Sequence, residues 1–176
     1  TVDDSDVVMF TATSLGQNTA GSFSLYFDAS DVGLSSDNED VDAVELLPDG
    51  RLLVSTTSTF SVPGLSGEDK DVIAFSGTFG STTSGSWAMY FDGSDVGLAT
   101  SSSEDVDGLA VAASGNIYLS TVGDFSVSGL SGADEDVFVC NSPISGPSTA
   151  CSSFTLFFDG SVYGLSGNDI FAIELP

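Results

Sequence analysis

Large apolar side chains fall on one face of several short segments of the chain. In the segment 87–91, Trp87, Met89 and Phe91 occupy alternate positions, and the segments 23–27 and 154–158 show the same pattern. A period of two places successive side chains on opposite faces of a β-strand. These three segments are therefore predicted to be half-buried strands.

Other segments show different strand signatures. The segment 71–76 is a short, nearly continuous apolar run, as expected for a strand that is buried on both faces. The segments 106–112 and 116–121 complete a set of four strands, and Pro48-Asp49-Gly50 is a tight-turn sequence that joins the corresponding pair earlier in the chain. No stretch shows a sustained 3.6-residue apolar period. The sequence predicts an all-β fold with essentially no helix.

Three phrases recur along the chain at intervals of 64 to 67 residues. They are the nonapeptide at 26–34 with its copies at 90–98 and 157–165, the acidic phrase at 39–42 and 104–107, and the glycine-rich phrase at 64–67 and 129–132. The 176 residues are therefore interpreted as one repeat domain. Its parts are a partial repeat at 1–36, full repeats at 37–100 and 101–167, and a final strand at 168–176.

Four strands in a repeat of this length are typical of a β-propeller blade with long loops. The pattern predicts 11 strands, ending with 170–175, and lacks one strand equivalent to 51–57. We consider a closed three-fold barrel, a ring built by two chains, and a stacked solenoid. An unpaired strand edge invites pairing with another chain. The vacancy would then be filled by a strand of a neighbouring subunit, covered by a loop, or filled by chain that precedes Thr1.

Charge is strongly one-sided. The chain has 26 acidic residues against Arg51 and Lys70, no histidine, and a formal net charge of −24. Such a balance disfavours binding to nucleic acid or to anionic membranes, because few cations are available to neutralise phosphates. No run of 18 apolar residues is present, so no membrane span is predicted.

Two cysteines, Cys140 and Cys151, lie in a segment that is predicted to form a hairpin. They do not form a CxxC motif, and no histidine is present to complete a zinc site. We interpret them as a disulfide, which implies an oxidising compartment. The alternative is a pair of free buried thiols.

The aspartates recur at fixed places in the repeat, which makes them candidate calcium ligands. Calcium binds six to eight hard oxygen atoms, and an Asp-x-Asp pair at a strand start presents two carboxylates on one face. The alternative is a set of solvated acids that maintain solubility and block edge pairing. The candidate ligands are Asp4, Asp6, Asp28, Asp31, Asp40, Asp42, Asp69, Asp71, Asp92, Asp95, Asp105, Asp107, Asp134, Asp136, Asp159 and Asp169.

The third copy of these acidic motifs is incomplete. Val162 and Phe171 stand where the other copies have aspartate. The third copy is therefore expected to bind cations most weakly.

The sequence carries no recognisable catalytic motif. Without histidine, neither a Ser-His-Asp triad nor a Cys-His pair can form. A two-carboxylate glycosidase remains formally possible, but an active site usually breaks the symmetry that these repeated acids keep. Trp87 is a candidate sugar-stacking side chain, although its alignment with Phe23 and Phe154 favours a core position. The sequence predicts a protein that is not an enzyme.

The phrases at 90–98, 104–107 and 60–67 resemble propeller-blade-like β-repeat modules of large, secreted, multidomain bacterial surface proteins. The resemblance covers nearly the whole chain and implies a secreted, cell-surface location, but it carries no ligand. The leading functional hypothesis is a calcium-stabilised extracellular module that self-associates into a homo-oligomer, filament or surface assembly, with strand complementation between subunits. The alternative is an adhesion module that binds a glycan or a cell-surface protein.

Overall fold

The computed structural model describes residues 2–36, 38–98 and 103–176, and it confirms the predicted all-β class. Residue 37 and residues 100 and 101, where two repeat boundaries are predicted, lie outside the described residues. Within the described part, the helical elements are three short 3-10 helices. None of the helices in the described residues is long and apolar enough to cross a membrane.

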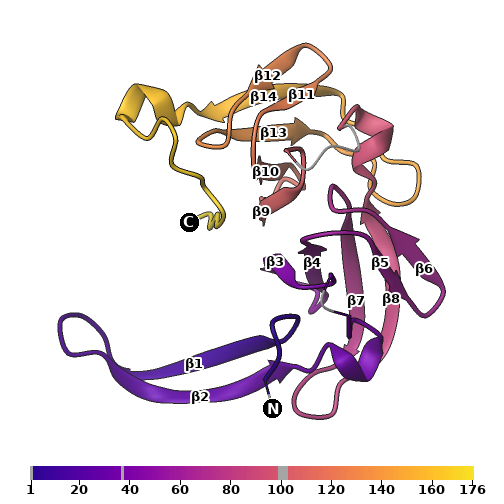
Figure 1. Cartoon of the computed structure of the whole chain (residues 1–176), viewed down its shortest axis with the longest axis vertical. Coiled ribbons are helices and arrows are strands. Elements are labelled where there is room, and N and C mark those ends of the chain that lie inside the picture. The colour runs from indigo at the N-terminus through magenta and orange to yellow at the C-terminus, as the bar shows by residue number, and fades with distance from the viewer. Residues whose placement is uncertain (1, 37, 99–102) are drawn as a thin grey trace.

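Two four-stranded antiparallel sheets form the main body (Figure 1). The first contains, in spatial order, β3 (Val41–Leu46), β4 (Leu52–Thr56), β7 (Val72–Thr78) and β8 (Ser84–Phe91). The second contains β9 (Val106–Val111), β10 (Ile117–Thr121), β13 (Val137–Asn141) and β14 (Ser153–Phe158) in the same order. A two-stranded sheet, β1 (Val7–Ser14) and β2 (Ala20–Phe27), precedes them along the chain.

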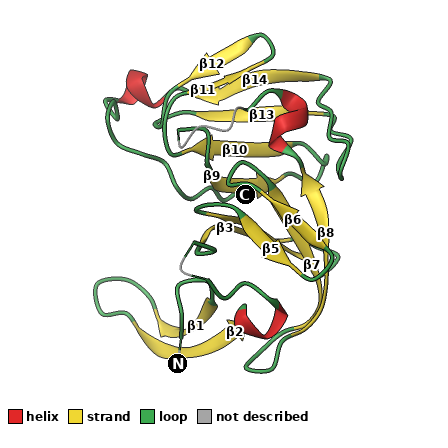
Figure 2. Ribbon diagram, turned by 45° about the vertical axis from the view of Figure 1, so that its right-hand side comes forward, coloured by secondary structure: helices red, strands yellow, loops and turns green. Residues whose placement is uncertain are grey.

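The two four-stranded sheets present equivalent edges to each other. Strand β3 packs against β9, and both lie toward the middle of the view in Figure 1, whereas β8 and β14 lie away from it. The turned view in Figure 2 shows the three sheets following one another along the chain. The described residues form an open array, and no barrel or ring closes among them.

Two additional short hairpins interrupt the four-strand pattern. Strands β5 (Phe60–Val62) and β6 (Leu65–Gly67) pair with each other, as do β11 (Phe125–Val127) and β12 (Leu130–Gly132). Gly64 and Gly129 form the turns with φ of 83° and 79°, which glycine adopts without steric cost. The sequence pattern did not predict these hairpins.

Each outer strand continues into a 3-10 helix. These helices are η1 (Ser30–Val32) after β2, η2 (Gly93–Val96) after β8, and η3 (Gly160–Tyr163) after β14. They correspond to the recurring nonapeptide. The motif therefore forms a turn at one end of each sheet.

Apolar side chains are buried mainly where successive units meet. One core cluster joins residues of β2, such as Phe27, to residues of β4, β5 and β7, such as Phe75. The second cluster joins residues of the two four-stranded sheets, including Phe91 and Phe138. Burial at these junctions supplies the hydrophobic stabilisation that a single unit lacks.

A close packing pair in the earlier units is replaced by a disulfide in the last sheet. The Phe75 ring lies against Gly85, and the Phe10 ring lies against Gly21 in the same way, so that a Cβ atom at either glycine would clash with the ring. By strand register, Cys140 occupies the position of Phe75, and it forms a disulfide with Cys151. The predicted pairing of the two cysteines is confirmed.

Removing this disulfide is expected to destabilise the chain. We expect the variant C140S/C151S to lose about 2–3 kcal/mol of unfolding free energy, since the crosslink restricts the unfolded chain. Urea denaturation of the variant and the oxidised parent checks this expectation. An equal midpoint and slope for the two proteins would contradict it.

The predicted final strand is wrong. The segment 170–175 has an apolar pattern, but residues 168–176 form no strand in the structure. The backbone N–H of Ile170 donates to the carbonyl oxygen of Asp134 (3.1 Å), so the segment is anchored at its start. A strand needs a hydrogen-bonding neighbour along its length, and in the described residues no strand forms a ladder of backbone hydrogen bonds with this segment.

Candidate functional site

The predicted ligand residues fall into three structural groups with different environments. The first group contains Asp6, Asp71 and Asp136, at equivalent places before β1, β7 and β13. Asp71 accepts a hydrogen bond at Oδ2 from the backbone N–H of Glu68 (2.9 Å) and at Oδ1 from that of Gly93 (3.0 Å). Each carboxylate of this group thus ties the start of a strand to the turn that follows the next strand.

The same double hydrogen bond occurs in the other two copies. Asp6 accepts from the backbone N–H groups of Asp3 and Ala29, both at 2.9 Å. Asp136 accepts from those of Ala133 and Gly160, both at 3.1 Å. Both oxygens of each residue therefore serve the fold, which explains a carboxylate at this position without a metal ion.

The second group lies in the recurring turn. Asp92 caps η2, where its Oδ1 accepts from the backbone N–H (3.1 Å) and the hydroxyl (2.6 Å) of Ser94. Asp28 and Asp159 accept from the hydroxyls of Ser30 and Ser161 in the same manner. These carboxylates hold the turn in its shape.

The second acid of the turn reaches across to the next unit. Asp31 Oδ2 accepts from the backbone N–H of Thr83 (2.9 Å), and Asp95 Oδ2 accepts from that of Thr149 (2.8 Å). The hydroxyls of these threonines accept from the backbone N–H groups of Asp28 (2.9 Å) and Asp92 (2.8 Å), respectively. The acids of this group thus join neighbouring units.

A backbone hydrogen bond completes each of these contacts. The N–H of Gly80 donates to the carbonyl oxygen of Tyr26 (2.7 Å), and that of Gly146 donates to the carbonyl oxygen of Tyr90 (2.8 Å). We call this arrangement the outer junction. It joins the turn 26–31 to the loop 80–83, and the turn 90–95 to the loop 146–149.

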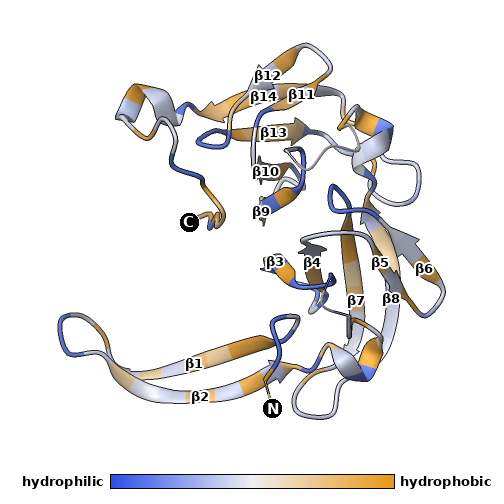
Figure 3. Cartoon of the chain, viewed as in Figure 1, coloured by the Kyte–Doolittle hydropathy of each residue, from blue (hydrophilic) through white to orange (hydrophobic). Residues whose placement is uncertain are grey.

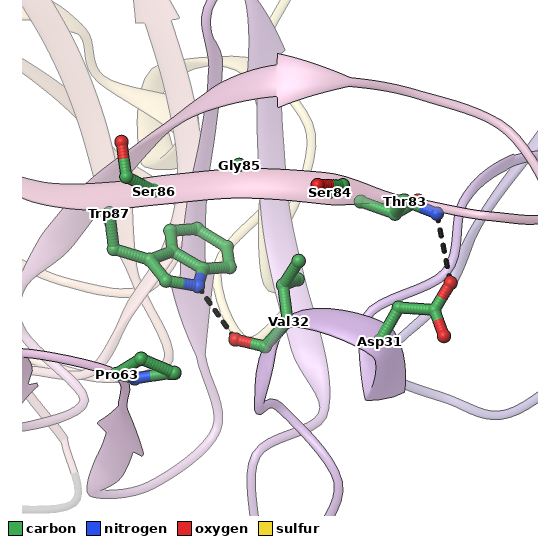
Figure 4. Close-up of a pocket in the computed structure, with 8 residues that line it drawn as sticks. All are labelled: Asp31, Val32, Pro63, Thr83, Ser84, Gly85, Ser86 and Trp87. Atoms are coloured by element: carbon green, nitrogen blue, oxygen red, sulfur yellow. Dashed lines mark hydrogen bonds between the residues drawn. The ribbon is translucent and has the colours of Figure 1, made fainter.

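The first outer junction encloses a pocket of about 300 Å³ (Figure 4). The Trp87 indole N–H donates to the carbonyl oxygen of Val32 (2.9 Å), and its ring packs edge-on against Phe75 with 5.0 Å between centroids. These contacts agree with the expected core role of Trp87. The lining residues are Asp31, Val32, Pro63, Thr83, Ser84, Gly85, Ser86 and Trp87.

The third group surrounds the neighbouring inner strands β3 and β9. Asp42 Oδ1 accepts from the Ser55 hydroxyl (2.6 Å), and Asp107 Oδ1 accepts from the Ser120 hydroxyl (2.9 Å). The Oδ2 atoms of both aspartates and the Oδ1 atoms of Asp69 and Asp105 are buried and receive no hydrogen bond from the described residues. Four buried carboxylate oxygens here therefore lack a protein donor.

The carboxyl groups of this third group interact in pairs. Asp42 lies within interaction range of Asp105, and Asp107 lies within interaction range of Asp169. Asp69 lies within electrostatic range of Asp105, and Asp134 lies within range of Asp169. Asp4 lies within interaction range of Asp40 at the corresponding place in the first repeat.

Burial raises the pKa values of Asp42, Asp105 and Asp107, and repulsion from neighbouring carboxylates adds to this effect for Asp105 and Asp107. Burial, followed by the charges of Asp42, Asp69 and Asp107, raises the pKa of Asp105 to about 8. Burial likewise raises the pKa of Asp107 to about 7, opposed in part by the Ser120 hydrogen bond. The protein itself therefore provides little stabilisation for full ionisation of this group.

In the described residues, no three carboxylate or cysteine side chains converge as a ready-made metal site. The predicted set of 16 ligands thus separates into residues that hydrogen-bond the backbone and residues that face one another near the inner strands. Comparisons with protein-family models, with curated proteins and with solved structures find no match for this chain. The surface-protein resemblance of its repeats remains a prediction.

Several residues of these networks were not identified from the sequence. Thr83 and Thr149 complete the outer junctions, and their recurrence 66 residues apart was an available signal. Glu39 accepts hydrogen bonds from the backbone N–H groups of Ser35 (3.0 Å), Ser36 (3.0 Å) and Ser61 (2.8 Å). Glu104 makes the equivalent bond to the N–H of Ser126 (2.7 Å). Repetition identifies such residues as candidates, but it does not reveal their partners.

Proposed function

We propose that the chain is a non-enzymatic, extracellular structural module whose repeats associate end to end with a second copy of the chain. The observation that carries the proposal is the β1–β2 loop. It has the form of the loop in an outer junction, but the described residues place no turn against it.

The β1–β2 loop has the same local geometry as the loops in the two outer junctions. The Thr19 hydroxyl donates to the carbonyl oxygen of Gly16 (2.8 Å), as Thr83 does to Gly80 (3.0 Å). Gly16 and Gly80 have positive φ angles of 108° and 121°, which give the loops similar backbones. The N–H of Gly16 and the hydroxyl of Thr19 are thus placed to receive another turn.

Apolar exposure supports the same conclusion. Phe23 is 75% exposed, whereas its register equivalent in the next sheet, Trp87, is half-buried against Phe27 and Phe75. Leu15 is 80% exposed, whereas the corresponding Phe79 stacks on Tyr26. Figure 3 shows apolar segments along this hairpin, which has no sheet packed beyond it in the described residues. Such exposed apolar surface favours association.

The other end of the chain presents the complementary turn. Phe157 occupies the position of Tyr26 and is 60% exposed, so that it can pack against Leu15 of a second copy. In the same contact the backbone of Asp159 would meet the Thr19 hydroxyl. Val162 stands where Asp31 and Asp95 accept a threonine N–H in the other copies. The intermolecular junction therefore lacks one hydrogen bond that the internal junctions have.

Repeated head-to-tail contacts produce a ring or a filament, depending on the rotation between copies. We propose that the sheets are arranged as propeller-like blades, with β3 and β9 on the inside. Strand β1 pairs with β2 alone in the described residues, which leaves an edge for strand complementation by a neighbouring subunit. The disulfide is consistent with a secreted, cell-surface setting.

Changes at the two chain ends test this proposal. We expect Val162→Asp to strengthen self-association roughly tenfold or more, because the new carboxylate can accept the Thr19 N–H in a charge-assisted hydrogen bond. Leu15→Ser is expected to weaken association, since it removes exposed apolar surface without altering the core. Sedimentation velocity over a concentration series at physiological salt measures both effects.

Val122→Asp provides the matched control. Val122 is an exposed apolar residue away from both ends, so this variant adds the same charge without the new acceptor. Added negative charge alone weakens association of so acidic a chain. The proposal is wrong if Val162→Asp behaves like this control, or if the parent protein stays monomeric at every concentration.

The pocket at the first outer junction favours glycan binding as a second candidate function. It combines the side of Trp87 with the carboxylate of Asp31 in a space that suits a small sugar. The second junction has Phe154 at the position of Trp87, which makes the first pocket distinct. Binding of a mono- or disaccharide that changes Trp87 fluorescence would support this function, and a silent glycan array would exclude it.

A further inference from the structure

Two acidic groups recur near the inner strands, and each combines the same three positions of the repeat. The first contains Asp42, Asp69 and Asp105, and the second contains Asp107, Asp134 and Asp169, which follow at offsets of 64 or 65 residues. A backbone hydrogen bond fixes each group: Val106 N–H donates to Asp69 O (3.2 Å), and Ile170 N–H donates to Asp134 O (3.1 Å). The arrangement is therefore a property of the repeat.

Two of these side chains are more than nine-tenths buried and have an oxygen without a protein donor. Asp105 is 7% exposed and Asp107 is 3% exposed. Asp105 Oδ1 and Asp107 Oδ2 receive no hydrogen bond within the described residues. A buried ionised carboxylate without a donor or counter-ion is strongly destabilising, so this geometry calls for a cationic partner.

Each of the two basic residues of the chain has a carboxylate partner outside the two groups. Arg51 forms an ion pair with Asp49 (2.8 Å), and the Lys70 ammonium group pairs with Glu68. The sequence contains no other lysine or arginine and no histidine. Protein side chains therefore cannot neutralise both acidic groups.

We infer that each group binds one divalent cation, with calcium preferred: the first between Asp42 and Asp105 with Asp69, the second between Asp107 and Asp169 with Asp134. Calcium accepts six to eight oxygen ligands in a flexible shell that includes backbone carbonyls and water. The three carboxylates of each group do not converge beforehand, so the ion draws them together as it binds. This inference is independent of the end-to-end association.

Space for this movement exists beside the first group. Asp42 lines a cavity of about 250 Å³ together with Val44, Leu109 and residues 171–173.

Calorimetric titration with calcium chloride and thermal denaturation test the inference, at protein concentrations where sedimentation shows a monomer. We expect two calcium ions per chain and an increase in Tm over the same protein in EDTA. Magnesium is expected to bind more weakly, because its octahedral shell tolerates less variation. Sodium chloride at matched ionic strength controls for charge screening.

Replacing one aspartate of each group by the isosteric asparagine tests the two proposed cation sites separately. Asp105→Asn is expected to leave one calcium ion per chain by disrupting the first group, and Asp107→Asn is expected to do so by disrupting the second. In EDTA, Asp105→Asn should be more stable than the parent, since an amide removes repulsion and can donate to Asp42. Asp124→Asn, at an exposed acid outside both groups, should keep both ions.

Three results would overturn the inference. The first is the absence of binding heat together with an unchanged Tm in calcium. The second is an equal Tm gain from the sodium chloride control, which would reduce the effect to screening. The third is a parent-like stoichiometry of two ions in both Asp105→Asn and Asp107→Asn. None of these results depends on whether copies of the chain associate.

Discussion

In the absence of divalent cations, the chain is expected to become less stable as the pH rises from about 4 to about 8. The folded state raises the pKa of Asp105 from 3.8 to about 8, that of Asp107 to about 7 and that of Asp42 to about 6. Burial is the first cause in each case. Between the unfolded and folded pKa values, the folded chain binds more protons than the unfolded chain.

The sign of the dependence follows from proton linkage. When the folded state holds more protons, the free energy of unfolding decreases with increasing pH. The stabilisation is complete below the unfolded pKa and is lost as the pH passes the folded values. Glu39 and Asp49 have lowered pKa values and act in the opposite direction, but only near and below their ordinary values of 4.5 and 3.8.

The groups that face these carboxyls are themselves acidic. Asp105 faces Asp42, Asp69 and Asp107, and Asp107 also faces Asp169. A net shift of one pKa unit corresponds to about 1.4 kcal/mol. For a chain of this size that amounts to about 3–6 °C in Tm, and we expect a decrease of at least this size. Thermal denaturation in EDTA from pH 4.5 to 8.5 measures it, and a flat or rising stability curve would contradict the expectation.

Asp71→Asn is expected to lower the free energy of unfolding by about 2–3 kcal/mol. The amide keeps the size of the side chain. Its NH₂ group, however, faces one of the two backbone N–H donors whose hydrogen bonds the carboxylate oxygens accept in the parent protein. Hydrogen bonds from Glu68 and Gly93 then cannot both persist. Burial raises the pKa of Asp71, so removal of its charge offsets part of this loss.

The three copies of this contact provide an internal comparison. Asp136→Asn should cost a similar amount, because Asp136 is buried and makes the same pair of hydrogen bonds. Asp6→Asn should cost less, since Asp6 lies in the more exposed first unit. Urea denaturation gives the ranking, with Asp124→Asn as the exposed control. A smaller loss for Asp71→Asn than for Asp6→Asn would disprove the proposed role.

The strands were predictable where side-chain alternation extends over several residues. The segment 87–91 lies within β8, and 71–76 overlaps β7. The hairpins β5–β6 and β11–β12 were missed because a strand of three residues is too short to show a period. The final segment shows the reverse situation: its apolar pattern resembles a strand, but pairing depends on a neighbour that local sequence does not specify.

The candidate ligands illustrate a different limit. Asp69 and Asp71 are two residues apart and look equivalent in the sequence. In the structure Asp71 accepts hydrogen bonds from two backbone N–H groups, whereas Asp69 has a buried oxygen that lacks a protein donor. The difference arises from the path of the backbone and from the unit that packs beside it. Periodicity therefore identified the acidic positions but not which of them face one another.

The outer junction has a consequence for how proteins of this kind can change in length. Every contact in it joins one turn to one loop of the following repeat, and both partners lie at fixed positions in the repeat. Duplication or deletion of a whole repeat in register leaves a matched turn and loop at the new boundary. The architecture can thus grow or shrink by recombination without compensating substitutions in the core.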